Sequence, residues 1–129
     1  MKVDFLEGHS EDFPILRIDL QDTTIETIEC FCRGIDDLGS RFSTTFRFQE
    51  CSGLVEKGCH VVCVVSDREE GLIAVQPEAC FEWRRTADGW KSIRRQLDPF
   101  LERFPTCSIF DWLDDLSEIS VLITTTGFW

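Results

Sequence analysis

The feature that most constrains the fold of this chain is the segment CHVVCVVS at residues 59–66, an unbroken run of β-branched residues and cysteines. Strands with one solvated face alternate apolar and polar residues, whereas strands covered on both faces carry continuous apolar runs. The segment therefore predicts a strand near the middle of a β-sheet. The rest of the chain then has to supply strands beside it and elements that cover its two faces.

Shorter stretches with a two-residue period predict the other strands. Residues 2–7 and 14–20 alternate apolar and polar positions on either side of a turn-like GHSEDF, which predicts an opening hairpin. Residues 42–48 alternate in the same way, as in a strand with one solvated face. The remaining strand-like runs are residues 71–76, 79–85 and 119–125. Pro77, between the first two of these runs, marks a break or an edge.

Two helices are predicted from apolar residues that recur on one helical face. Thr23 and Glu26 have the spacing of a capping box, which predicts a helix at about 23–33 that Gly34 ends. Residues 90–104 keep one apolar stripe over fifteen positions. Pro99 interrupts this stripe on its solvent side, so we expect either a kink or a new helix capped by Asp98.

A third helix is expected at residues 109–118, which gives the predicted architecture. The fold class is α+β: a single domain over residues 1–129, with a mostly antiparallel β-sheet and two or three helices packed on it. The chain length of 129 residues fits one domain with its own core.

The charge of the chain limits the kinds of partner that it can bind. Asp and Glu number 24 against 13 Lys and Arg, which gives a net charge of −11, and the excess of acids lies at the two ends. Binding of nucleic acid or of anionic membranes requires Lys and Arg, so the composition opposes both and favours a basic partner. No apolar run approaches the roughly 20 residues that span a bilayer, and the acidic start is unlike a secretion signal. We therefore expect a cytoplasmic protein.

The seven cysteines are interpreted as small buried hydrophobes. They are Cys30, Cys32, Cys51, Cys59, Cys63, Cys80 and Cys107. The odd count excludes complete internal pairing, and neither close pair can converge on a zinc ion: Cys30 and Cys32 would diverge on a helix, and Cys59 and Cys63 would lie roughly 13 Å apart on a strand at about 3.3 Å per residue. His9 and His60 are the two histidines that could activate a thiol nucleophile, and nucleotide-binding loops are absent from the sequence. We therefore predict no catalytic residue, no metal site and no cofactor.

The segment SIFDWLDDLSE at residues 108–118 carries acids without a compensating base. On a helix its acids would lie on one face, opposite an apolar face, which predicts either a solvated surface or a docking surface for a cationic partner. Trp112 or the pair Phe128 and Trp129 would supply an aromatic anchor. If the ends of the chain meet, N-terminal acids would extend the surface. The predicted partner-binding residues are Asp111, Trp112, Asp114, Asp115, Glu118, Glu7, Glu11 and Asp12.

As a whole, the chain resembles the immunity proteins of bacterial polymorphic-toxin and contact-dependent growth inhibition systems. The likeness lies in a small cytosolic α+β domain without an assembled active site and with an acid surface at Asp111, Asp114, Asp115 and Glu118. It implies a monomer or weak dimer that binds a cognate toxin, often a basic nuclease, and blocks it stoichiometrically without catalysis. Two alternatives remain open: an acidic chaperone or adaptor for a client polypeptide, and a small cysteine-dependent enzyme or ligand-binding domain.

Overall fold

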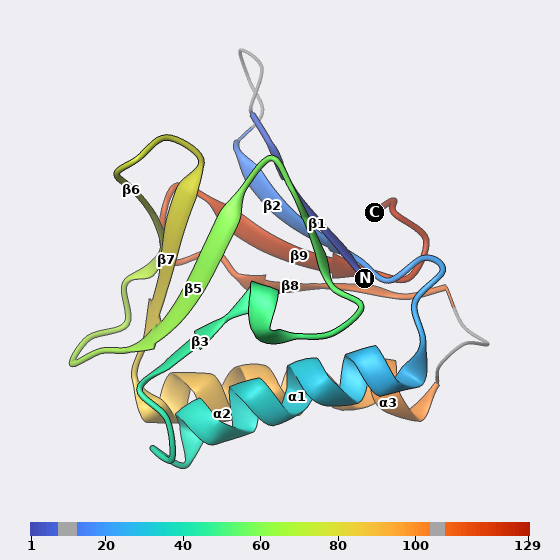
Figure 1. The fold of residues 1–129 in the computed structure, drawn as a ribbon, viewed down its shortest axis with the longest axis horizontal. Helices are drawn as coiled ribbons and strands as arrows, with labels where there is room; N and C mark the ends of the chain where they lie inside the picture. Colours follow the sequence, from blue (N-terminus) through green and yellow to red (C-terminus); the bar gives the residue numbers. More distant parts are fainter. Residues whose placement is uncertain (8–12, 104–107) are drawn as a thin grey trace.

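Two β-sheets lean together over a layer of helices in the computed structural model, which describes residues 1–7, 13–103 and 108–129 (Figure 1). The five-stranded sheet has the order β4-β1-β2-β9-β8 and comprises β1 (Lys2–Leu6), β2 (Ile15–Asp19), β4 (Val55–Lys57), β8 (Phe110–Asp114) and β9 (Ser120–Thr124). The four-stranded sheet has the order β3-β5-β7-β6 and comprises β3 (Thr45–Arg47), β5 (His60–Val65), β6 (Gly71–Val75) and β7 (Cys80–Arg85). The helical elements are α1 (Ile25–Gly39), the short 3₁₀ turn η1 (Phe48–Glu50), α2 (Ala87–Gln96) and α3 (Asp98–Glu102).

The predicted α+β fold class is confirmed, with mixed rather than mostly antiparallel sheets. The opening hairpin β1–β2 is antiparallel and β5 is an internal strand, as predicted. Three strand pairs are parallel, namely β1 with β4, β2 with β9 and β5 with β7. Strand β6 comes between β5 and β7 in the sequence but lies on the far side of β7, at the edge of the sheet. Strands β5 and β7 are therefore neighbours and run in the same direction.

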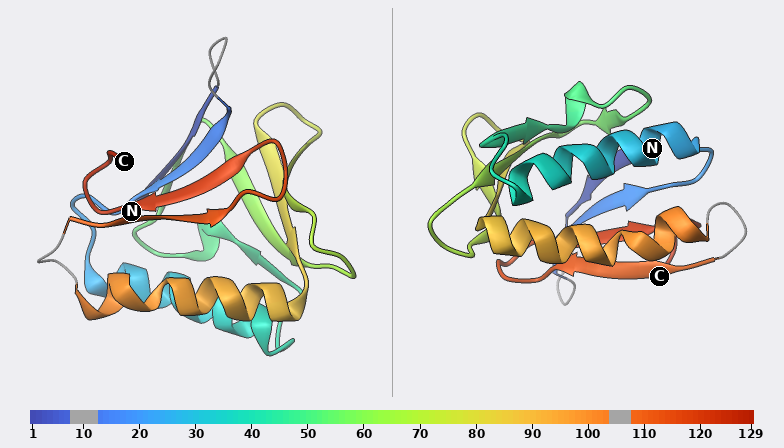
Figure 2. Two further views of the ribbon diagram at one scale, coloured as in Figure 1. Left: turned by 180° about the vertical axis from the view of Figure 1, so that it is seen from behind. Right: turned by 90° about the horizontal axis from the view of Figure 1, so that it is seen from below.

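The core fills the space between the two sheets and the helices. Seen from below, α1 and α2 lie side by side across the open side of the two sheets (Figure 2). Phe31 of α1 packs against Phe46 and Phe48, with ring centroids 6.1 and 5.4 Å away. Trp83 of β7 packs edge-on against Trp90 of α2 at 5.0 Å, and both are fully buried. None of the described helices is long and apolar enough to cross a membrane.

Helix α1 is longer than predicted, because Gly34 does not end it. Thr24 rather than Thr23 accepts the capping hydrogen bond, from the backbone N–H of Thr27, and the helix continues to Gly39. A Cβ atom on Gly34 would lie 2.5 Å from Cζ of Phe46. Glycine is therefore explained here by the close approach of a phenylalanine ring to the helix rather than by a helix terminus.

Replacing Gly34 with alanine is expected to lower the free energy of unfolding by about 1–3 kcal/mol, although alanine is the better helix former. The added methyl group would overlap the buried ring of Phe46, which has to move. Urea denaturation followed by circular dichroism measures the change. Gly39→Ala is the matched control, because its Cβ would meet only the flexible Lys91 side chain at 3.0 Å and backbone at ordinary distances. Equal stability of the two variants would contradict the role given to the ring.

Two other predicted elements change in the structure, and one strand is additional. The stretch predicted as a strand at 42–48 forms only β3, and Phe42 is exposed outside it. The short strand β4 was not predicted. Residues 90–104 form two helices: α2 begins after the N-cap Thr86, and α3 is the new helix expected at Pro99, with Leu97 rather than Asp98 as its cap.

The predicted helix at 109–118 is wrong, because this segment forms the edge strand β8 and the turn that follows it. Phe110 and Trp112 also satisfy the two-residue period of a strand, so the local pattern fits both structures. Pairing with β9 selects the strand, since β9 is buried along nearly its whole length and β8 completes its hydrogen bonds on one side. The single acidic helix face predicted from the sequence does not exist.

Candidate functional site

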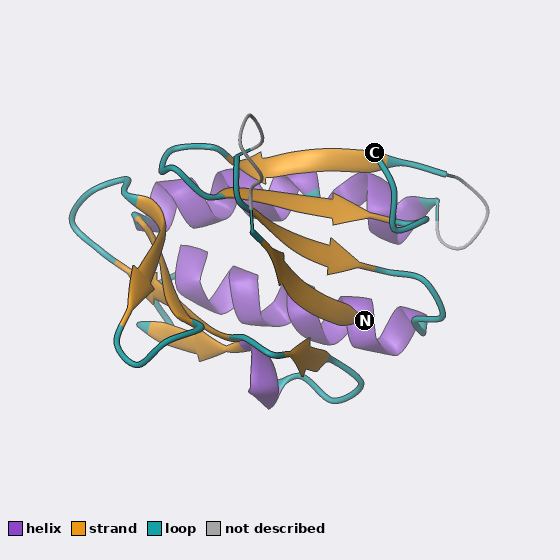
Figure 3. Cartoon of the chain, turned by 90° about the horizontal axis from the view of Figure 1, so that it is seen from above, coloured by secondary structure: helices purple, strands orange, loops and turns teal. Residues whose placement is uncertain are grey.

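Exposed aromatic side chains gather where β8 lies beside the C-terminal segment. Phe110 and Trp112 alternate along β8 and point away from the helices, with exposed fractions of 50% and 38%. Trp129 packs edge-on against Trp112 with ring centroids 6.4 Å apart, and Phe128 is 75% exposed. We call Phe110, Trp112, Phe128 and Trp129 the C-terminal aromatic surface. Figure 3 shows β8 at the outer edge of the five-stranded sheet, with the C-terminus beside it.

Hydrogen bonds hold the C-terminal segment against the outer face of the sheet. The buried Thr124 hydroxyl donates to the carbonyl oxygen of Phe128 at 2.7 Å, and Nη1 of Arg17 donates to the carbonyl oxygen of Gly127 at 3.0 Å. Gly127 has a φ of 80°, which glycine adopts without strain. The aromatic rings are thus presented from a segment whose backbone is fixed.

The charges around this surface are acidic. Residues 108–129 contain four acids and no Lys or Arg. Asp115 and Glu118 are exposed in the turn between β8 and β9, together with the apolar Leu116. Arg17 lies on the same face of the sheet, but Asp4 pairs with its guanidinium through bonds of 3.0 and 2.7 Å. A cationic partner would therefore meet aromatic rings and carboxylates here.

Asp114, predicted to bind a partner, is instead part of the link between the two sheets. Its side chain is fully buried, and its Oδ2 accepts hydrogen bonds from Nε1 of Trp83 at 2.6 Å and from Nη1 of Arg85 at 3.1 Å. Its Oδ1 accepts from the backbone N–H of Leu116 at 2.8 Å. Both oxygens are thus satisfied inside the protein, which leaves this carboxylate unable to contact a partner.

Arg85 extends this link to Glu69 in the connection before β6. Burial raises the pKa of Glu69, but hydrogen bonds from Thr86 and Arg85 outweigh it, so the pKa lies below its ordinary value. The guanidinium of Arg85 therefore lies between two carboxylates, Glu69 and Asp114.

The other predicted acids also separate in space. Asp111 faces the helices rather than solvent, and its Oδ2 accepts a hydrogen bond of 3.3 Å from Nε2 of Gln96 on α2. Glu7 is exposed after β1, whose last residues pair through β2 with the start of β9, at the opposite end of the sheet from Thr124. Glu11 and Asp12 lie outside the described residues. Of the predicted set, Trp112 thus belongs to the aromatic surface, whereas Asp115 and Glu118 are exposed in the turn that follows β8, at the end of the strand away from Phe110.

Sequence reasoning missed Phe110 and Leu116 as exposed apolar residues, because a helix would have buried both. The alternation of Phe110 and Trp112 was the signal available for the first. Five of the eight large hydrophobic residues that are exposed among the described residues lie between 110 and 129. This concentration marks the C-terminal part of the chain as the candidate binding surface.

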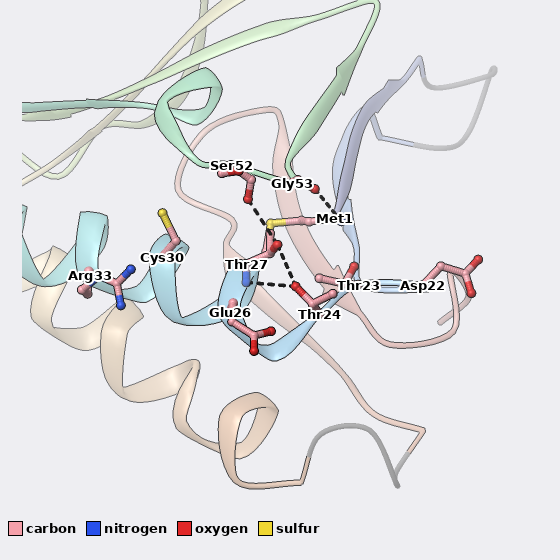
Figure 4. A pocket seen from close by; sticks show the side chains of 10 residues that line it. All are labelled: Met1, Asp22, Thr23, Thr24, Glu26, Thr27, Cys30, Arg33, Ser52 and Gly53. Atoms are coloured by element: carbon pink, nitrogen blue, oxygen red, sulfur yellow. Dashed lines mark hydrogen bonds between the residues drawn. The ribbon is translucent and has the colours of Figure 1, made fainter.

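A pocket of about 540 Å³ at the start of α1 is another candidate (Figure 4). Its lining residues are Met1, Asp22, Thr23, Thr24, Glu26, Thr27, Cys30, Arg33, Ser52 and Gly53. Among the described residues, no group of three or more His, Cys, Asp or Glu side chains could hold a metal ion. His60, which could have activated a thiol, lies on the exposed face of β5 and pairs with Glu56 at 3.5 Å. His60 is therefore not among the residues that line this pocket, and His9 lies outside the described residues.

The described cysteines lie largely as interpreted from the sequence. The buried thiols are those of Cys32, Cys51, Cys59 and Cys63, whereas Cys30 and Cys80 are half-buried and Cys107 lies outside the described residues. Burial raises the pKa of Cys32 and of Cys59 to about 11. Arg84, Arg85 and Arg94 form ion pairs with acids.

Comparisons of the chain with protein-family models, with curated proteins and with solved structures give no match. We therefore base the proposed function on the C-terminal aromatic surface and on the charge around it.

Proposed function

We propose that this protein is a protein-binding inhibitor of the immunity type, which neutralises a cognate basic toxin by stoichiometric binding and occlusion. The observation that carries the proposal is the exposed C-terminal aromatic surface, on a strand whose following turn carries the exposed carboxylates of Asp115 and Glu118. Soluble monomers rarely expose contiguous apolar patches unless they bind something, and tryptophan is enriched among the residues that dominate binding energy.

The chemistry of this surface favours a partner that presents arginine or lysine. A guanidinium or ammonium group is attracted to the face of a tryptophan ring, and Trp112 with Trp129 offers two such rings in contact. The carboxylates of Asp115 and Glu118, within a chain of net charge −11, would accelerate the encounter with a cationic surface. The aromatic anchors would then supply most of the lasting affinity.

The fixed backbone of the C-terminal segment supports the same role. Binding costs less free energy when the contacting side chains are already ordered in the free protein. The bonds from Thr124 and Arg17 hold residues 127 and 128 in place before any partner arrives. An inhibitor that acts by occlusion needs no catalytic group, so the proposal assigns none of the described residues a role as acid, base or nucleophile.

Trp112→Ala is expected to weaken binding of the partner by about tenfold to several hundredfold, as at the centre of other interfaces. The partner to use is the toxin domain encoded beside the gene, and surface plasmon resonance gives both rate constants. Phe42→Ala is the matched control, because Phe42 is also exposed, at 82%, but lies between α1 and β3. If Phe42→Ala weakened binding of the toxin domain and Trp112→Ala did not, the interface would lie at Phe42 rather than on β8.

Asp115→Lys combined with Glu118→Lys is expected to slow association several-fold at low salt and much less at high salt, because exposed charges act mainly on encounter. Both residues are exposed, so the fold should tolerate the change. Growth rescue by co-expression with the toxin domain tests the function itself. If co-expression gives no growth rescue and the two proteins form no one-to-one complex, the immunity proposal is wrong.

A chaperone or adaptor for a client polypeptide is the second candidate, and the exposure of Phe128 and Phe110 is the observation that favours it. A chaperone would bind unfolded segments of its client, whereas an immunity protein binds the folded toxin. Competition between a folded toxin domain and its urea-unfolded form, diluted into the same assay, separates the two functions.

A further inference from the structure

Two thiols from different parts of the chain meet beside the pocket at the start of α1. Sγ of Cys51, in the segment after η1, lies 3.5 Å from the carbonyl oxygen of Thr27 and donates a hydrogen bond to it. Cys30 follows Thr27 by three residues, so both lie on the same side of α1. Figure 4 shows the sulfur of Cys30 pointing from the helix toward the segment that carries Ser52.

Cys30 also packs against the buried core cluster that includes Cys51. Burial and the neighbouring Cys30 thiol together raise the pKa of Cys51 to about 12. Two neighbouring thiols on separate elements are arranged as a dithiol that small movements could join.

The two thiols differ in access to solvent. Cys51 is 2% exposed, whereas Cys30 is half-buried. Cys30 lines the pocket of about 540 Å³ and also a second pocket of about 260 Å³ beside Gly34 and Phe46. A small reagent can therefore reach Cys30 from solvent, with Cys51 behind it.

We propose that Cys30 and Cys51 form a thiol–disulfide exchange site that takes low-molecular-weight disulfides, with Cys30 as the attacking thiol and Cys51 as the resolving thiol. The thiolate of Cys30 attacks one sulfur of the disulfide and breaks the S–S bond, which releases one thiol. Cys51 then loses its proton to solvent and attacks Sγ of Cys30, which releases the second thiol. The protein loses two electrons and two protons, and the small disulfide is reduced to two thiols.

The product would join α1 to the segment between η1 and β4. Before oxidation the two elements are held by the hydrogen bonds that Thr27 makes with Ser52 and Cys51. A disulfide between residues 30 and 51 would fix the two segments on this side of the pocket to each other. It would also lower the conformational entropy of the unfolded chain. The site is independent of the aromatic surface and of the proposed toxin inhibition.

The test is to incubate the reduced protein with glutathione disulfide, quench the thiols with an alkylating agent and map the peptides by mass spectrometry without reduction. The expected result is a Cys30–Cys51 peptide pair and a loss of about two hydrogens from the intact chain. Cys51→Ser should accumulate a mixed disulfide with glutathione on Cys30, because its resolving thiol is missing. Cys80→Ser is the matched control, since Cys80 is also half-buried, and it should still form the pair.

Two results would overturn the proposal. One is a wild-type chain in which Cys30 and Cys51 are both found alkylated, and were therefore still reduced at the quench, although other thiols have reacted with glutathione disulfide. The other is glutathione on Cys30 of the wild type without any cross-link to Cys51. The wild-type mapping needs no substitution, so it decides the question even if Cys51→Ser fails to fold.

Discussion

Replacing Asp114 with alanine is expected to lower the free energy of unfolding by about 3–5 kcal/mol, the range found when one partner of a buried ion pair is removed. The substitution leaves the indole N–H of Trp83 without its acceptor in a fully buried position. It also leaves Arg85, whose side chain is only 14% exposed, with Glu69 as its remaining ion-pair partner among the described residues. Because β8 and β7 belong to different sheets, the loss loosens the contact between the sheets.

Urea denaturation monitored by tryptophan fluorescence measures this loss, and Asp115→Ala is the matched control. Asp115 is the next residue and is exposed, so its removal should change the stability by no more than about 0.5 kcal/mol. The free energy of unfolding of Asp114→Asn should lie between those of the two alanine variants. An amide oxygen can still accept the hydrogen bond from Trp83, but it does not neutralise the charge of Arg85. Equal stability of the alanine variants at 114 and 115 would show that the buried network contributes nothing.

The sequence could not distinguish Asp114 from Asp115, and the reason is physical. Both acids are adjacent and surrounded by the same apolar residues, so local pattern gives them the same environment. What separates them is the register shift in β8 between Trp112 and Asp114, which directs Asp114 toward Trp83 and Arg85. Those two partners lie about thirty residues earlier in the chain, on the other sheet, and no local signal connects them to Asp114.

Elements with one dominant period were predicted well. The opening hairpin, the internal strand β5 and the closing strand β9 follow directly from their apolar patterns. Prediction failed where two periods fitted the same residues, as at β8, or where tertiary contact explained a residue, as for Gly34 against Phe46. The candidate site shows the same division: Trp112, predicted as an anchor, is exposed, whereas the predicted acidic face depended on a helix that is absent.

The free energy of unfolding is expected to fall steeply above pH 9, by about 1.4 kcal/mol per pH unit for each buried thiol that titrates. Burial raises the pKa of Cys32 and Cys59 to about 11 and that of Cys51 to about 12, and it holds the pKa of Cys63 well above its usual value. Below pH 9 the thiols are protonated in both states, so their contribution to stability is complete. Between pH 9 and 11 they ionise only in the unfolded chain, which therefore gains stability relative to the folded chain.

With four such thiols the combined slope reaches about 5 kcal/mol per pH unit, which is comparable to the whole stability of a small domain. The chain has no tyrosine and few lysines, so apart from its cysteines few side chains titrate in this range. Urea denaturation at pH 8, 9, 10 and 10.5, with a phosphine reductant present, measures the slope. Cys63→Ala should reduce the slope by about one quarter, because it removes one of the four protons released on unfolding. Stability that stays level to pH 10.5 would mean that these thiols ionise as readily in the folded protein as in the unfolded chain, and that the core around them admits water.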